Sequence, residues 1–408
     1  MPSLFRTHSA RLSVEVLEDR TTPTFLARPG PQRLTVNDFT VPTGGLSIAA
    51  GNLFPEAGFG GSVENEYVTG TGPGIEGLVR VWRFNGLVSG QGVPALSFVP
   101  FAGFAGGLNV AVGDVLGDGA PEIIAAVAGK GPPHVKVFNA NGQEIASFMA
   151  FEPGFLGGVN IAVGNVLGGI AAGGFSGGAV SQDYKQEIII GAAAGGTPHV
   201  VVTNATGTVL RSFLAFDLRY QGGVVVAAAS IDTQRTAAFA LTGSDTNAYD
   251  EVVVGSATAV PHVKAFEVWT GAITERLSFY AFDPAIQQGV TITAGTTANR
   301  RGADIFVSQI APPASAAAPT IRVFSGTGQL QVEVAPFPPG YSRVVNMSVA
   351  YLTNGMYDPS DDDSLAFGND SFDFLTQDLT VVAGDGPYQQ IPRFFIGLPN
   401  APAGSSGP

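Results

Sequence analysis

Three acidic residues are concentrated in one short stretch of an otherwise apolar segment, GDVLGDGAPEI at residues 113–123. Asp114, Asp118 and Glu122 lie around two glycines, and carboxylate oxygens are the ligands that a hard cation such as Ca²⁺ prefers. The spacing therefore predicts an oxygen-ligand loop for a cation. A second interpretation is a turn whose carboxylates accept hydrogen bonds from local backbone amides.

The composition limits the partners of this chain. Among 408 residues, 33 are acidic and 20 are basic, and the net charge of −13 repels a phosphate backbone. We therefore expect no nucleic-acid partner. The chain has no cysteine, so its sequence offers no thiol or zinc–thiolate chemistry. No apolar run reaches the length of about 18 residues that a membrane-spanning helix needs, so we expect no membrane span.

Four kinds of segment recur in a fixed order along the chain. The first is a glycine-led apolar run, such as GGLNVAVGDV from Gly106, and the second begins with an acidic residue, such as EIIAA from Glu122. The third has the pattern PHVKVF, from Pro133, and the fourth ends in a pair of aromatic residues, such as SFMAF ending at Phe151. The first three kinds occur six times and the fourth kind five times.

These segments have the properties of β-strands. They are rich in Val, Ile and Phe and are bounded by Gly, Pro and Asn, which favour turns. Between the third and fourth kinds, pairs such as Asn141-Gly142 tolerate the positive φ angles of a tight hairpin. The third and fourth strands of each unit are therefore expected to be antiparallel neighbours.

A four-stranded antiparallel sheet repeated about every 60 residues is typical of a β-propeller blade. Each blade is covered on both faces by its neighbours, which accounts for a charged fraction of only 13%. The last unit lacks a fourth segment, and a strand at residues 32–41 can replace it and remove the exposed edges. We therefore predict an all-β fold, a six-bladed β-propeller of four-stranded antiparallel blades, closed by an N-terminal strand that completes the last blade.

The predicted organisation has three parts. Residues 1–31 are expected to be a disordered export or sorting segment, residues 32–396 the propeller, and residues 397–408 a flexible tail. The expected blades are residues 44–101, 106–151, 157–216, 222–282, 289–337 and 344–396, the last together with the strand at 32–41.

Two resemblances go beyond these patterns. LSVEVLEDRTTPT, at residues 12–24, resembles the LE-x-R-x-x-P motif at the start of many bacterial exported and surface proteins, which implies a secreted or cell-surface location. The run at residues 106–123 and the repeated P-H-V-x-x-F and S-F-x-A-F elements resemble the FG-GAP/VCBS repeat family. That family implies an integrin-like propeller, used in binding and adhesion more often than in catalysis.

The same resemblance implies a set of calcium ligands. In the FG-GAP/VCBS family, the loop between the first and second strands looks like Asp-x-Asp-x-Asp-Gly-x-x-Asp and binds calcium. Matching positions here are Asp114, Asp118, the backbone carbonyl of Ala120, and Glu122, whereas Leu116 stands where the family has another Asp. With one ligand missing, we expect weak calcium binding.

Other residues that could do chemistry give weaker signals. His134, His199 and His262 occupy one repeated position, and on a ring they would be far apart, so we expect structural or surface roles. The stretch GGFSGG at 173–178 resembles a nucleophile motif but lacks the preceding strand-to-helix pattern. Trp269 is expected either to pack over a hairpin or to offer a surface on which a sugar could stack.

These observations lead to one prediction of function and two alternatives. We predict an exported or cell-surface, non-catalytic propeller that binds a protein or a polysaccharide at its loop face. An alternative is a polysaccharide lyase or hydrolase acting at the mouth of the axial channel, which converging His, Arg, Tyr or acidic side chains would favour. A structural envelope component that assembles through a large apolar patch is also compatible with the sequence. No feature of the sequence predicts an oligomeric state.

Overall fold

The computed structural model describes residues 34–35, 46–54, 66–82, 94–167, 169–170, 182–183, 185–231, 249–295, 303–309, 320–334, 345–350, 378–383, 390–391 and 393–394. Within these ranges the regular structure consists of β-strands that pair in antiparallel sheets, which confirms the predicted all-β class. Among the described residues, no helix is long and apolar enough to cross a membrane.

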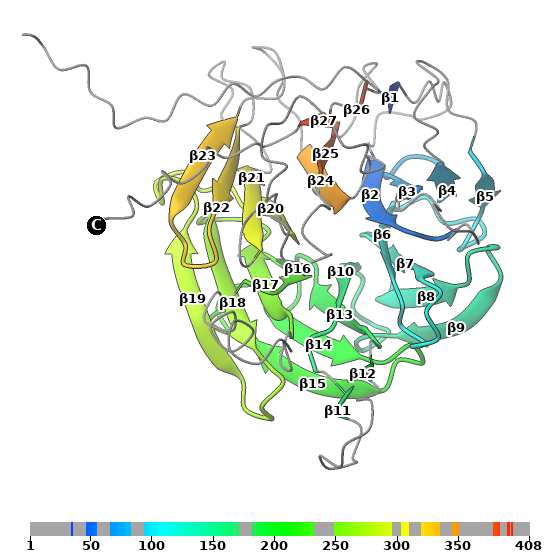
Figure 1. The fold of residues 1–408 in the computed structure, drawn as a ribbon, viewed down its shortest axis with the longest axis horizontal. Coiled ribbons are helices and arrows are strands. Elements are labelled where there is room, and N and C mark those ends of the chain that lie inside the picture. Colours follow the sequence, from blue (N-terminus) through cyan, green and yellow to red (C-terminus); the bar gives the residue numbers. More distant parts are fainter. Residues whose placement is uncertain are drawn as a thin grey trace, which may run out of the picture.

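Five sheets have four strands each, in chain order from the axis outward (Figure 1). The first contains β2 (Leu46–Gly51), β3 (Glu66–Thr71), β4 (Val79–Trp82) and β5 (Leu96–Phe98). The second contains β6 (Leu108–Gly113), β7 (Glu122–Val127), β8 (His134–Phe138) and β9 (Glu144–Met149). The third contains β10 (Val159–Gly164), β13 (Glu187–Ala192), β14 (His199–Thr203) and β15 (Val209–Leu214).

The remaining strands complete the fold. The fourth sheet contains β16 (Val224–Ala229), β17 (Glu251–Ser256), β18 (His262–Glu267) and β19 (Thr274–Tyr280). The fifth contains β20 (Val290–Gly295), β21 (Asp304–Gln309), β22 (Ile321–Phe324) and β23 (Leu330–Val334). A three-stranded sheet contains β24 (Val345–Ala350), β25 (Asp378–Ala383) and β27 (Arg393–Phe394). β11 (Gly169–Ile170) pairs in antiparallel fashion with β12 (Gln182–Asp183).

The first strands of these sheets surround a common axis. β6 contacts β2 and β10, β16 contacts β10 and β20, and β24 contacts both β20 and β2. The contacts therefore form a closed ring, and the sheets radiate from it as the blades of a β-propeller (Figure 1).

The core lies in the seams between neighbouring sheets. One apolar cluster joins the first and second sheets, for example Val68 and Val79 with Leu108 and Ile123, and equivalent clusters fill the next three seams. The second strands of the five four-stranded sheets are covered on both faces, and every residue of β7 is buried. This two-sided burial explains why the strands are nearly continuous runs of Val, Ile and Ala.

The hairpins between the third and fourth strands form as predicted. In the β8–β9 turn, the side-chain oxygen of Asn139 accepts hydrogen bonds from the amides of Asn141 and Gln143, both at 3.0 Å. Gly142 adopts a φ of 76°, which glycine tolerates without a steric penalty. A register shift between Val137 and Phe138 accompanies this turn.

The prediction of six four-stranded blades is wrong. In the described part of the chain there are five four-stranded sheets, and the predicted sixth blade is the three-stranded sheet β24–β25–β27. The N-terminal strand β1 (Leu34–Thr35) does not complete that sheet, because it pairs with β26 (Gln390–Ile391) in a separate two-stranded sheet. A proline at position 392 separates β26 from β27, and proline has no N–H with which to continue a strand ladder. The one C-terminal segment is thus divided between two partners.

Candidate functional site

The loop between β6 and β7 carries the predicted calcium ligands. Asp114 Oδ1 accepts hydrogen bonds from the amides of Gly117 at 2.7 Å and Asp118 at 3.1 Å, and its Oδ2 accepts one from Gly119 at 2.8 Å. Asp118 Oδ1 accepts a hydrogen bond from the amide of Ala120 at 3.0 Å. Both aspartates therefore cap amides of their own loop, as the second interpretation of this sequence expects.

Unlike the two aspartates, Glu122 is buried. Its side chain is 2% exposed, and Oε2 accepts hydrogen bonds from the amides of Val115 at 3.0 Å and Leu116 at 3.2 Å. The pKa of Glu122 is raised to about 7, and burial is the largest cause. The two amide hydrogen bonds oppose this rise, whereas the nearby charges of Asp118 and Asp114 contribute to it.

The role of Glu122 is repeated around the propeller. Glu66, Glu187 and Glu251 also begin second strands, are buried, and accept hydrogen bonds from amides that follow the first strand of their own sheet. The shared function of these carboxylates is to satisfy backbone donors that a buried loop would otherwise leave unpaired. The sequence showed the repeated acidic position but not this use of it.

The predicted calcium ligands lie in a loop whose carboxylates accept hydrogen bonds from backbone amides. Within the described ranges, no group of three or more acidic or histidine side chains is arranged to hold a metal ion. Leu116 supplies no side-chain ligand, and the aspartates bind amides. The donor set does not fit a calcium ion as it is arranged here, and calcium binding by Asp114, Asp118, Ala120 and Glu122 stays a prediction.

Hydrogen bonds also tie two of these loops to the next sheet. The amide of Asp114 donates to Gln186 Oε1 at 2.9 Å, and the amide of Gln186 donates back to the carbonyl of Asp114 at 2.8 Å. Asn165 and Asp250 form the same reciprocal pair one sheet further on, at 2.9 and 2.8 Å. We call these pairs the interblade latches.

The repeated histidines lie in three different sheets, at the starts of β8, β14 and β18. Nε2 of His134, His199 and His262 is hydrogen-bonded to a serine hydroxyl of the adjacent fourth strand, at 2.7, 2.7 and 2.8 Å. Their rings pack against Phe101, Phe151 and Phe216 of the preceding unit, with centroids 5.0, 5.3 and 5.4 Å apart. These contacts agree with the structural role predicted for the histidines.

Burial lowers the pKa of all three histidines below the ordinary value of 6.5. Beside His134, Lys136 lies 5.3 Å from the Phe101 ring centroid and pairs with Glu144 at 2.8 Å. Arg322 repeats this arrangement in the fifth sheet, 4.6 Å from the Phe282 centroid. In these two seams a cation therefore stacks on an aromatic ring of the preceding sheet.

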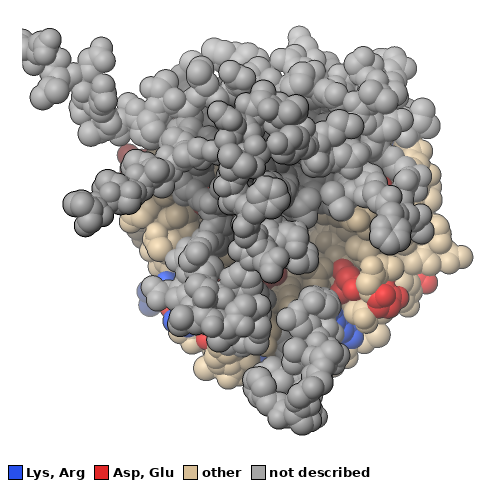
Figure 2. All heavy atoms as spheres, in the orientation of Figure 1, with Lys and Arg blue, Asp and Glu red and all other residues tan. Residues whose placement is uncertain are grey.

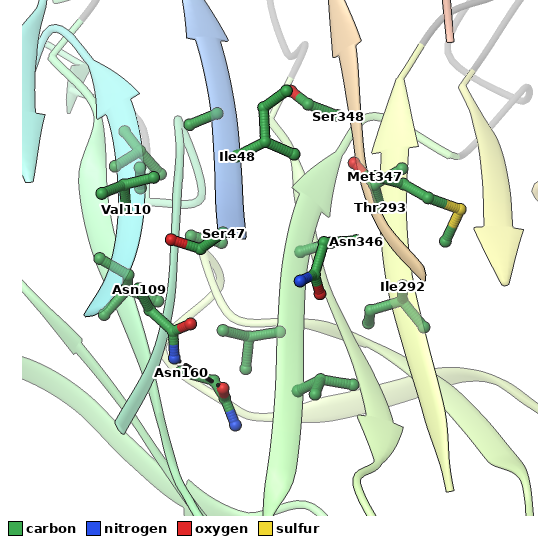
Figure 3. A pocket seen from close by; sticks show the side chains of 18 of the residues that line it. Ser47, Ile48, Asn109, Val110, Asn160, Ile292, Thr293, Asn346, Met347 and Ser348 are labelled. Carbon is green, nitrogen blue, oxygen red and sulfur yellow. Dashed lines mark hydrogen bonds between the residues drawn. The ribbon is translucent and has the colours of Figure 1, made fainter. Parts of the chain in front are cut away.

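A cavity of about 230 Å³ follows the axis of the propeller (Figure 3). It is lined by β2, β6, β10, β16, β20 and β24. The described lining side chains are aliphatic, hydroxyl or amide groups and the thioether of Met347, and none of them is ionisable. Asn109, Asn160 and Asn346 occupy the same position in β6, β10 and β24. The sequence analysis did not single them out, although each is an amide inside an otherwise apolar run.

Each of these asparagines binds the neighbouring first strand. Asn109 Nδ2 donates to the carbonyl of Val159 at 2.8 Å and to Asn160 Oδ1 at 3.0 Å. Asn160 Nδ2 donates to the carbonyl of Val224 at 2.8 Å. Inner strands lack a strand neighbour on the axis side, so the amides satisfy carbonyls that would otherwise face the channel unpaired.

Two candidates from the sequence lie outside the described residues. These are the N-terminal motif at 12–24 and the stretch GGFSGG at 173–178. Trp269 is within the described part and packs against Tyr249, with ring centroids 5.3 Å apart. This contact agrees with the packing role rather than with an open surface for sugar stacking.

No protein-family model matches the chain, and no curated protein matches its sequence. Among solved structures, it is similar to Sqt1 of Saccharomyces cerevisiae, with 12% identity and a TM-score of 0.38 over 80% of this chain and 67% of that one. A chain of a mitotic checkpoint complex gives 12% identity and a TM-score of 0.44, with 97% and 99% covered. The Dos1 propeller gives 14% identity and 0.39, with 82% and 76% covered. Similarity at this level says nothing about function.

Proposed function

We propose that this chain is a non-catalytic propeller, exported or held at the cell surface, that binds a protein partner through apolar side chains on its outer strands. The observation that carries the proposal is a repeated exposed position. The variable residue of the S-F-x-A-F segment is Val99, Met149, Leu214 and Tyr280 in the first four sheets, and these side chains are 42%, 42%, 42% and 53% exposed. We call these four residues the outer apolar row.

Packing accounts for the neighbours of this row more fully than for the row itself. Alternate side chains of a strand point to opposite faces, and the phenylalanines next to the row, such as Phe148 and Phe213, pack into the seams. Phe279, in the fourth sheet, lies 4.6 Å from the ring of Phe324 in the next sheet. Val99, Met149 and Leu214 are exposed instead, and there a large apolar side chain contributes little to folding. Tyr280 is exposed as well, although its ring also packs on His262, with centroids 4.7 Å apart.

Further apolar surface lies close to the row in the chain. Leu156 and Leu218, in the loops that follow β9 and β15, are 61% and 60% exposed. In Figure 2 the described part of the visible face is mostly uncharged. Methionine and aromatic residues are enriched in protein–protein interfaces, and charged residues are depleted from their centres. These properties support a protein partner.

The axial channel supports binding rather than catalysis. General acid–base catalysis requires ionisable groups within hydrogen-bonding reach of a substrate, and the described lining of the channel offers amides, hydroxyls and aliphatic groups. The lyase or hydrolase alternative required a converging ionisable cluster at this place.

Export is supported by the motif at residues 12–24.

The test compares two sets of exposed side chains. Purified wild-type chain, the double variant Leu214→Ser/Tyr280→Ser and the control Leu330→Ser would be immobilised and exposed to surface extracts of the producing cells. Leu330 is 51% exposed but begins β23, outside the row. We expect a partner that binds wild type and control alike and binds the double variant at least about tenfold more weakly.

Three results would contradict the proposal. One is equal binding by all three proteins, and another is a ligand that proves to be a polysaccharide insensitive to the row. The third is the release of new reducing ends or unsaturated sugars from polysaccharides by the purified chain, which would show catalysis. Fractionation of cells that express the full chain or a chain without residues 1–31 tests export separately.

A further inference from the structure

The axial cavity contains a level of polar side chains that is independent of the outer apolar row. At the second position of each first strand lie Ser47, Asn109, Asn160, Val225, Thr291 and Asn346. Five of these six residues carry a hydroxyl or an amide. Figure 3 shows the side chains of Ser47, Asn109, Asn160 and Asn346 in the cavity.

The hydrogen bonds fix the orientation of the amides. The nitrogens of Asn109, Asn160 and Asn346 each face a backbone carbonyl, at 2.8, 2.8 and 2.7 Å. A carbonyl can only accept a hydrogen bond, so the nitrogen must be the atom that faces it. The oxygen of each amide therefore occupies the other branch of the side chain.

In this orientation the amide nitrogens donate hydrogen bonds, and amide and hydroxyl oxygens keep lone pairs that can accept. Asn109 donates to two acceptors, and Ser47 donates its hydroxyl hydrogen to the carbonyl of Gly70 at 3.3 Å. The amide oxygens of Asn109 and Asn346 keep their lone pairs, and the Ser47 oxygen can also accept. Acceptor sites at this level therefore outnumber the hydrogens that are free to donate.

The surroundings determine which donor-rich ligand the level favours. Aliphatic side chains such as Ala49, Ala111 and Ala162 line the cavity beside it, and the chain as a whole has a net charge of −13. An apolar wall weakens the screening of partial charges, and the net charge disfavours anions. The lining has no carboxylate, which calcium and magnesium sites require.

We propose that the level formed by Ser47, Asn109, Asn160 and Asn346 binds a small primary ammonium cation. The ammonium group has three N–H donors, which match a ring of neutral oxygens, and its alkyl part fits the aliphatic wall. A cavity of about 230 Å³ accommodates a short-chain amine.

The experiment uses the full chain and three probes of similar size: ethylammonium chloride, ethanol and sodium acetate at constant ionic strength. Binding would be followed by NMR through the backbone amide signals of β6, β10 and β24. We expect saturable shifts with ethylammonium and no saturation with ethanol or acetate. Equal saturation with ethanol, or no saturation with ethylammonium, would overturn the proposal.

Two variants test the level itself. Asn109→Val places at this position the residue type that the fourth sheet already has at Val225, and it should weaken ethylammonium binding about tenfold. Val225→Asn adds an amide oxygen and should strengthen binding, so the test does not depend on one variant that folds poorly. Unchanged affinity in both variants would also overturn the proposal.

Discussion

The side-chain amide of Asn346 donates a hydrogen bond of 2.7 Å to the backbone carbonyl of Leu46, a residue 300 positions earlier in the chain. It is the point at which the three-stranded sheet meets the first blade. Asn109 and Asn160 make the same bond between sheets that are consecutive in sequence, so closure of the ring repeats an ordinary seam.

Asn346→Ala tests this closure. The change leaves the Leu46 carbonyl without its side-chain donor, and we expect the free energy of unfolding to fall by about 1–3 kcal/mol. Urea denaturation would measure the loss, and hydrogen exchange should show faster exchange in β2. Asn141→Ala, in the exposed β8–β9 hairpin, is the control and should change stability by less than about 0.5 kcal/mol. Equal effects of the two variants would contradict the closing role.

The turns between second and third strands offer a test of backbone strain. Lys130 and Ala259 have φ angles of 54° and 60°, at the position where the third sheet has Gly195, with a φ of 98°. Because only glycine adopts this region without penalty, Lys130→Gly and Ala259→Gly should each raise the free energy of unfolding by about 0.5–1 kcal/mol.

Gly195→Ala is the matched reverse change. A Cβ at Gly195 would meet nothing within 4 Å, so any loss of stability comes from the backbone conformation alone. We expect a loss of about 1–2 kcal/mol in thermal or chemical denaturation. If all three variants changed stability in the same direction, the strain argument would be wrong.

Glu122→Gln should change how stability depends on pH. The folded protein keeps the Glu122 proton up to a pKa of about 7, whereas an ordinary glutamate releases it near 4.5. The folded state therefore binds more protons between these values, and the contribution of Glu122 to stability is full below pH 4.5 and is lost as the pH rises through 7.

Glutamine stays uncharged and keeps an acceptor oxygen. The stability of Glu122→Gln relative to wild type should therefore rise between pH 4.5 and 7, by on the order of 1 kcal/mol or more. Urea denaturation at several pH values would measure the difference, with Glu152→Gln as an exposed control. Parallel stability curves for wild type and Glu122→Gln would refute the prediction.

The histidines should act on stability in the opposite direction. Burial lowers the pKa of His134, His199 and His262, so the unfolded chain takes up protons first as the pH falls below 6.5. Their contribution is full above pH 6.5 and decreases below it until the lower folded pKa values are reached. NMR titration of the imidazole signals should give pKa values under 6.5. A value above 6.5 at any of the three would contradict the burial argument.

Substitutions in the acidic loop can distinguish two roles of its carboxylates, the capping of backbone amides and the binding of calcium. Asp114→Ala removes the acceptor for three amides, and we expect a loss of about 1–2 kcal/mol with or without calcium. Thermal melts of wild type, Asp114→Ala and Asp118→Ala in calcium and in a chelator would measure this. A calcium-dependent rise in the Tm of the wild type, absent from Asp118→Ala, would instead support the predicted calcium loop.

The strands of the blades could be predicted because strands buried on both faces are apolar runs, and residues that favour turns separate these runs in the sequence. The strand pairing of the last unit could not be predicted from the sequence. The segments before and after Pro392 pair with different strands, and strand pairing depends on residues far apart in the chain. Similarity of DLTVV, from Asp378, to the other second strands predicted β25 correctly but not the number of strands beside it.

The candidate site shows the same limit. Spacing alone assigned Glu122 to a cation, whereas its environment depends on where the end of β6 places the amides of Val115 and Leu116. The amides in the channel left a usable signal, because Asn109 and Asn160 interrupt apolar runs at one repeated position. Their partners lie in the next sheet, which no local pattern reveals.

The interblade latches make the sheets unequal as building blocks. Gln186 and Asp250 each use both an amide hydrogen and a side-chain oxygen, but the corresponding residue before β7 is Pro121, which has neither group to offer. Transplanting the second sheet into the third position would thus leave the loop at Asp114 unsecured. When these sheets are shuffled or duplicated by design, each neighbour must therefore be chosen as carefully as the sheet itself, because the hydrogen bonds between sheets depend on the residues at their edges.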